Sequence, residues 1–153
     1  MKKRTKTYQP KPVKNTLHLF NGRAPADPKD ATTLKLVYRL IFERVRTGAA
    51  DEADLFAMAS LLENLHIAVE YSSDLDNKEA TFAQLRQAAS LIMHAVRNHR
   101  SALSGEGLTM LSEALAWHDA MLDHTSEYMV KQIVKVCQYR AEKGEFRVVQ
   151  TGN

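Results

Sequence analysis

The sequence predicts an all-α fold, a single four-helix-bundle-like domain that follows an extended basic N-terminal arm. Apolar residues recur every three to four positions from about residue 30 to residue 143, as they do on one face of a helix. All four prolines lie within the first 30 residues, so none interrupts that pattern. A length of 153 residues suits one domain that buries its own core.

Residues 1–29 are expected to form an extended, largely disordered arm. Each proline removes a backbone donor and pushes the residue before it toward an extended conformation. The first 30 residues carry eight basic side chains against two acidic ones, whereas the rest of the chain carries thirteen against sixteen. The net charge of +3 therefore combines a basic arm with a mildly acidic body.

The arm supplies the first candidate site, a cationic segment that suits phosphates or an acidic protein surface. Tyr8 could stack on a nucleic-acid base. The alternative is a tail that only solubilises the chain or folds back over the acidic body. The candidate contact residues are Lys2, Lys3, Arg4, Lys6, Tyr8, Lys11 and Lys14.

The first two helices have clear starts and stops. The first is predicted over residues 30–47 and ends before Gly48. Its apolar face holds Leu34, Val37, Leu40 or Ile41, and Val45. The second is predicted over residues 51–71, where Asp51 and Asp54 resemble a capping box. Its apolar stripe is Leu55, Met58, Leu62, Leu65 and Val69.

The second half of the body is predicted to hold two more helices. The third covers residues 77–100, is opened by Asp76 with Glu79, and has His99 and Arg100 at the negative end of its dipole. Its apolar stripe is Phe82, Leu85, Ala89, Ile92 and Val96. The fourth is predicted as one long helix over residues 105–143, bent near Thr125. Short connections favour an up-down-up-down course. Residues 145–153 are expected to form a short extended C-terminal tail.

The last helix is apolar over an unusually wide arc. His118 lies in the middle of its main stripe, so it is expected to be a buried polar residue with hydrogen-bond partners. A second apolar band beside the stripe includes Trp117, Met121 and Tyr128. So wide an arc needs cover from several neighbours, which favours a central position in the bundle. The alternative is that the band docks a partner protein.

Residues that suit catalysis or metal binding are few. Glu63 and His66 have the Glu-x-x-His spacing that di-iron bundles use twice, but no second copy is present. Cys137 has no activating motif beside it, which indicates an inert packed thiol. Phosphate-binding glycine loops, nucleophile elbows and paired cysteines are absent from the sequence. The sequence therefore predicts no enzyme, no cofactor, and no catalytic or metal-binding residue.

The cellular compartment follows from three absences in the sequence. One cysteine excludes an internal disulfide, which argues against an oxidised secreted scaffold. No apolar run approaches the roughly 18 residues of a membrane span. The basic start is not followed by the apolar segment of a signal peptide. A cytoplasmic protein is expected.

Two segments resemble small uncharacterised proteins encoded by phages and prophages of Proteobacteria. Residues 3–12 (Lys-Arg-Thr-Lys-Thr-Tyr-Gln-Pro-Lys-Pro) are similar to their Lys-Arg-x-Lys-Tyr-x-Pro-Lys-Pro start, with Thr7 inserted. Residues 115–123 are similar to a Leu-x-x-His-Asp-Ala-x-Leu-Asp segment near their end, which draws attention to His118, Asp119 and Asp123. The resemblance implies no activity. It implies work in the bacterial host cytoplasm while phage or prophage genes are expressed.

These observations favour a non-enzymatic phage-like accessory binding protein, whose basic arm contacts nucleic acid or an acidic partner. Its body would be a scaffold or a homodimer. The alternative is a module that regulates or inhibits a host or phage protein through Trp117, Met121 and Tyr128. A metal-binding bundle enzyme is the most distant hypothesis. Salt separates the first two, because phosphate binding weakens steeply with salt and apolar docking does not.

Overall fold

The computed structural model describes residues 28–73 and 76–149. This part of the chain folds into helices and contains no strand, which confirms the all-α prediction. The helices are α3 (Pro28–Arg46), α4 (Glu52–Tyr71), α5 (Lys78–Arg97), α6 (Gly105–His124) and α7 (Glu127–Lys143). The first begins two residues before its predicted start, with a proline in its first turn, where the missing N–H costs nothing.

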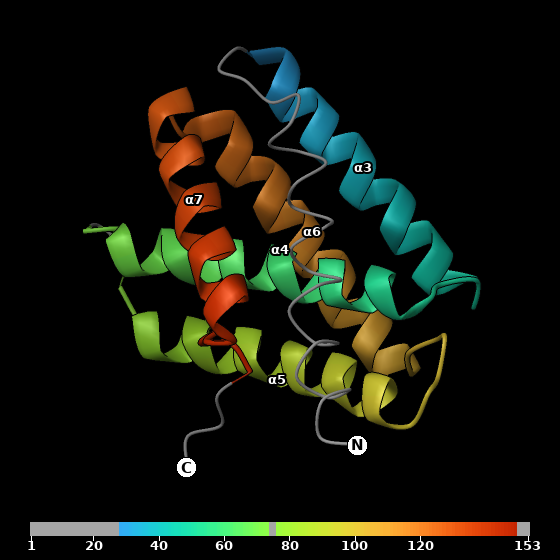
Figure 1. Cartoon of the computed structure of the whole chain (residues 1–153). Coiled ribbons are helices and arrows are strands. Elements are labelled where there is room, and N and C mark those ends of the chain that lie inside the picture. The colour runs from blue at the N-terminus through green and yellow to red at the C-terminus, as the bar shows by residue number, and fades with distance from the viewer. Residues whose placement is uncertain (1–27, 74–75, 150–153) are drawn as a thin grey trace.

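Helix α4 is the centre of the molecule. It packs against each of the other four helices, which lie around it in Figure 1. Every residue from 54 to 67 is buried, because this helix is apolar on nearly its whole circumference. The prediction of a central last helix was therefore wrong. Both the second and the last helix are apolar over a wide arc, and packing places the second one in the middle.

The predicted long last helix is in fact two helices, α6 and α7. Thr125 adopts an extended conformation (φ −118°, ψ 140°) and ends α6. The Ser126 hydroxyl then accepts a hydrogen bond from the Met129 N–H (3.2 Å) and caps α7. Serine and threonine side chains compete for backbone hydrogen bonds, and here that competition breaks the helix instead of bending it. The body therefore has five helices in its described residues, and the predicted count of four was wrong.

The start of α4 matches the sequence prediction. The Asp51 carboxylate accepts from the Asp54 N–H (2.9 Å), and the Asp54 carboxylate accepts from the Asp51 N–H (3.0 Å), so the capping box is present. Arg44 at the end of α3 also donates to Asp54 (Nε to Oδ2, 3.0 Å), which ties the two helices together. Helix α5 differs, since its N-cap is Asn77 in the left-handed region, without a side-chain cap.

The end of the described chain is not the extended tail that was predicted. Phe146 is 7% exposed and Val148 is 1% exposed, and both belong to the core. Residues 147–149 turn and do not run straight. Phe146 and Val148 are apolar enough to be drawn inward, and their burial sets the conformation of this segment. In the part of the chain described, no helix is long and apolar enough to cross a membrane.

Candidate functional site

Five polar side chains are buried within the central helix α4, where an unpaired polar group costs free energy. Each therefore needs a partner, and these partners reveal what the residues do. The residues are Asp54, Ser60, Glu63, Asn64 and His66.

Glu63 is the most deeply buried carboxylate among them, with no exposed surface. Arg140 of α7 donates from Nη1 to its Oε2 (2.6 Å), and the Val148 N–H donates to its Oε1 (3.0 Å). One buried charge thus holds both α7 and the segment after it against α4. Partial neutralisation by a guanidinium and a backbone donor is what allows a charge to remain in this position.

Glu70 extends the network one helical turn beyond His66. It accepts from Arg140 Nη2 (2.9 Å) and Arg147 Nη1 (3.0 Å), and its Oε2 lies 2.7 Å from His66 Nδ1. Burial would raise the pKa of Glu70, but Arg140, His66 and Arg147 outweigh it and lower that pKa. Glu70 is therefore ionised at neutral pH, and the two arginines balance the two glutamates.

His66 is buried at this network and stacked on Phe82 of α5, with ring centroids 4.2 Å apart. Burial lowers its pKa more than Glu63 and Glu70 raise it, so the imidazole is neutral at pH 7. His66 is thus an internal histidine. Its Nδ1 lies close to Glu70, but the contact does not have the geometry of a hydrogen bond.

The Glu-x-x-His spacing therefore serves an ion-paired network. Arg140 occupies the space beside Glu63 and Glu70 in which a cation would otherwise sit. Across the described residues, no group of three His, Cys, Asp or Glu side chains is arranged to hold a metal ion. What the arrangement can do chemically is join α4, α7 and residues 146–148.

His118 is fully buried, as its place in the apolar stripe of α6 predicts. The Asn64 amide nitrogen lies 3.3 Å from His118 Nε2, and the Tyr38 ring meets the imidazole edge to face at 5.1 Å. An amide nitrogen can only donate, so Nε2 accepts and the ring proton is on Nδ1. Burial lowers the pKa of His118 to about 3, which keeps it neutral in the folded protein.

Cys137 is buried beside the same network. Its Sγ lies 3.7 Å from the Ser60 carbonyl oxygen. Burial, reinforced by the charge of Glu63, raises the pKa of this thiol well above its usual value despite Arg140. A protonated, inaccessible thiol is a poor nucleophile and packs as a small apolar group.

The residues proposed to contact nucleic acid lie outside the described part of the chain. These are Lys2, Lys3, Arg4, Lys6, Tyr8, Lys11 and Lys14. Their contacts therefore stay a prediction that rests on the sequence.

The apolar band on the last helix is divided by the break at residue 125. Trp117 and Met121 belong to α6, whereas Tyr128 belongs to the first turn of α7. Trp117 is 41% exposed and Tyr128 is 68% exposed, while Met121 packs partly against the core. These three residues therefore do not form one stripe on one helix.

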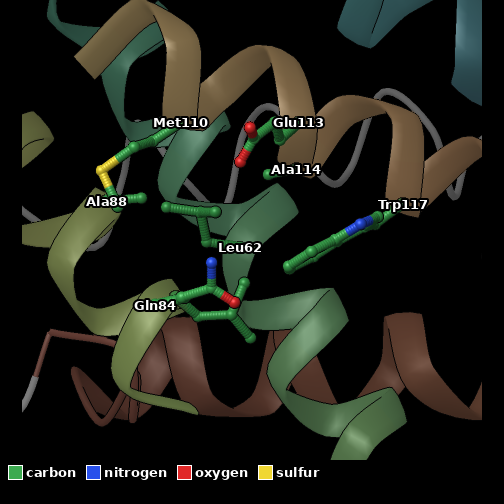
Figure 2. A pocket seen from close by; sticks show the side chains of 8 residues that line it. Leu62, Gln84, Ala88, Met110, Glu113, Ala114 and Trp117 are labelled. Carbon is green, nitrogen blue, oxygen red and sulfur yellow. The ribbon is translucent and has the colours of Figure 1, made fainter. Parts of the chain in front are cut away.

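Trp117 borders a small pocket of about 10 Å³ between α4, α5 and α6. Figure 2 shows its indole on one side, Gln84 of α5 below and Glu113 of α6 above, with Leu62 of α4 at the floor. The space holds about one water molecule, which is too little for a small-molecule ligand.

The cations of the body divide into two groups. The first group forms ion pairs with carboxylates within 4 Å and consists of Lys35, Arg39, Arg44, Arg46, Arg140 and Arg147. The second group consists of seven basic residues without such a partner among the described residues, and Arg97 and Arg100 are two exposed members of it. The paired cations hold helices together, as when Arg39 of α3 donates to Asp119 of α6 (2.7 Å).

Sequence reasoning missed Arg140, Glu70 and Asn64. Each is a polar residue on an apolar helical face, which is the only local signal of a buried partner. Which buried polar residues pair with each other depends on how α7 folds back over α4. That reversal follows from the break at Thr125. Comparison with protein-family models, curated proteins and solved structures finds no significant match.

Proposed function

We propose that this chain is a non-enzymatic, phage- or prophage-type accessory protein that binds the phosphate backbone of nucleic acid through the basic residues of its first 30 positions. The helical body is the folded domain to which these basic residues are attached. The observation behind the proposal is the partition of charge along the chain.

Of the thirteen basic side chains after residue 30, six form ion pairs with carboxylates, and the same part of the sequence carries sixteen acidic side chains. The first 30 residues have eight basic side chains for two acidic ones. Net positive charge is therefore concentrated in the arm. The rest of the sequence carries a net negative charge, which supports binding of a polyanion mainly through the arm.

The buried polar groups support a binding role in a second way. Glu63, Glu70 and Arg140 satisfy one another, and burial keeps the Cys137 thiol protonated. These residues are engaged in holding helices together. Phosphate contacts position a protein without reading bases, so we expect salt-sensitive binding with weak sequence preference.

The setting of this function is part of the proposal. The resemblance of residues 3–12 and 115–123 to small phage and prophage proteins supports action in the bacterial host cytoplasm. There the protein would meet host or phage nucleic acid while those genes are expressed.

Fluorescence anisotropy of labelled single- and double-stranded DNA and RNA tests the proposal. The test variant replaces Lys2, Lys3, Arg4, Lys6, Lys11 and Lys14 with glutamine in the full chain. A matched control replaces Lys131 and Lys135, two exposed lysines of α7. We expect binding by the natural chain and the control, and at least a hundredfold loss in the test variant. No binding by the natural chain would overturn the proposal and direct attention to acidic protein partners.

A second candidate function, docking of a protein, is favoured by one observation. Trp117 is 41% exposed beside the small pocket, which polar and apolar side chains line together. Tryptophan is enriched at protein interfaces. Because Trp117 is the chain's single tryptophan, its fluorescence emission reports whether a bound partner buries this side chain. A concentration-dependent blue shift that follows dimer formation in sedimentation would support docking of a second copy. An unchanged emission with a monomeric protein would reject the homodimer.

A further inference from the structure

Three helices end in the same hydrogen-bond motif, but one of them has an unusual residue in it. In each case a residue one or two positions after the helix end donates to the carbonyl three residues earlier, and the next residue donates to the carbonyl five residues earlier. The pivotal residue has a positive φ in all three helices. It is Gly48 after α3 (φ 80°), Gly144 after α7 (φ 71°) and His99 after α5 (φ 54°).

A histidine is a costly choice at this position. The left-handed region crowds the Cβ of any residue with a side chain, which is why glycine is usual there. A Cβ added at Gly48 or Gly144 would meet nothing within 4 Å, so the preference for glycine comes from the backbone conformation. Backbone strain of this kind often accompanies a functional requirement.

The surroundings of His99 are exposed and basic. His94, Arg97, His99 and Arg100 are all exposed at the end of α5, and we call these four residues the α5 cap patch. Among the described residues, neither Arg97 nor Arg100 has a carboxylate within 4 Å. The end of α3 is different, since the arginines there are paired.

One carboxylate lies near the α5 cap patch without neutralising its arginines, and a second lies farther back along α5. Burial raises the pKa of Glu52 at the start of α4, and the nearby His99 offsets part of that rise. Glu106 at the start of α6 accepts a hydrogen bond from Gln87 of α5 (3.3 Å).

The helix dipole explains part of this arrangement. Cations are favourable near the negative end of a helix, which accounts for Arg97 and Arg100. It does not account for a left-handed histidine, because a glycine there would leave both arginines in place. The Asn98 side chain donates to the His94 carbonyl oxygen (2.8 Å), which satisfies one of the last carbonyls of α5.

We propose that the α5 cap patch is a second contact for the phosphate backbone of the same nucleic acid that the arm binds. Arg97 and Arg100 supply charge, and the imidazole N–H of His99 donates to a phosphate oxygen. This inference rests on the proposed function.

The location of the α5 cap patch can be compared with the point where the arm joins the body. Figure 1 shows that the end of α5 lies at the same end of the molecule as the end of α3, away from where α3 begins. Helix α3 has 19 residues and is therefore about 28 Å long. The arm joins α3 at its other end. The patch and the point where the arm joins the body therefore lie toward opposite ends of α3.

The test measures how the affinity for a labelled duplex of about 20 base pairs, DNA and RNA in separate titrations, depends on salt. The patch variant is Arg97→Gln with Arg100→Gln in the full chain. The control is Arg39→Gln with Arg46→Gln, which removes two exposed but paired arginines. We expect the patch variant to lower the slope of log Kd against log salt by about 2 and the control to leave it unchanged.

His99→Gly separates binding from folding. Glycine relieves the backbone, so the melting temperature should rise by about 2 to 4 °C, while affinity for the duplex falls several-fold. Equal slopes for the patch variant and the natural chain, or unchanged affinity of His99→Gly, would overturn the patch. If the glutamine variant of the arm still loses binding in that case, the proposed function stands. If the natural chain binds no duplex, both proposals fail.

Discussion

The Arg140 guanidinium lies 2.6 Å from the Glu63 carboxylate, although 77 positions separate the two residues in the chain. Glu63 has no exposed surface and Arg140 has little, so the pair is an internal one. It joins the central helix α4 to α7, and through Glu63 it also holds the Val148 N–H. The fold of the C-terminal third depends on this contact.

Removal of one partner from the pair should be severe. Arg140→Met leaves Glu63 as an uncompensated buried charge and should lower the free energy of unfolding by about 3–5 kcal/mol. Adding Glu63→Gln should recover part of that loss, because the stranded charge disappears. Urea denaturation of both single variants and the double variant measures the coupling. Additive effects would show that the pair is not the clamp described here.

A surface ion pair provides the matched control. Arg39 and Asp119 are 2.7 Å apart, but Arg39 is half exposed. Arg39→Met should change the free energy of unfolding by only about 0–1 kcal/mol. A loss as large as that of Arg140→Met would mean that burial does not decide the value of these pairs.

Two leucines distinguish the core from the surface. Leu122 of α6 is 5% exposed and Leu40 of α3 is 63% exposed. Leu122→Ala should cost about 2–5 kcal/mol through a cavity, whereas Leu40→Ala should stay within about 0.5 kcal/mol. Thermal melts of the two variants check this. Similar melting temperatures would place Leu122 outside the core.

His118 makes folding sensitive to acid. Burial lowers its pKa from 6.5 to about 3, so between these values the unfolded chain binds a proton that the folded chain does not. This contribution is complete above pH 6.5 and is lost as the pH falls toward 3. It amounts to at most about 4–5 kcal/mol. Urea titrations at pH 7, 5 and 4 should show a steeper loss in the natural chain than in His118→Gln, and parallel curves would refute the assignment.

Two glycines should respond in opposite directions to alanine. Gly144 ends α7 with a φ of 71°, whereas Gly105 opens α6 with an ordinary φ, and neither has an atom within 4 Å of an added Cβ. Gly144→Ala should destabilise the protein by about 1 kcal/mol through backbone strain. Gly105→Ala should be neutral or stabilise it by up to about 0.5 kcal/mol, because alanine favours a helix. Chemical denaturation measures both, and equal effects would contradict the conformational explanation.

Local signals in the sequence predicted the elements well. The capping residues Asp51 and Asp54 act within one turn, so the start of α4 could be read directly. The burial of His118 and Leu122 follows from helical spacing, which the backbone geometry dictates. The break at Thr125 was expected only as a bend, because propensity does not say whether a helix bends or stops.

Long-range relationships could not be predicted in the same way. Both α4 and the α6 region are apolar over a wide arc, and only packing decides which is central. Arg140 pairs with Glu63 because α7 folds back over α4, and no residue spacing in the sequence predicts that reversal. The same holds for Asn64 and His118, 54 positions apart.

The salt dependence of nucleic-acid affinity tests the central claim most directly. Each phosphate contact contributes about 0.9 to the slope of log Kd against log salt for duplex DNA. The slope of the natural chain should therefore be steep, and replacing the six arm cations by glutamine should lower it by up to about 5. An affinity that does not depend on salt, or a slope that survives those substitutions, would contradict binding of phosphates by the arm.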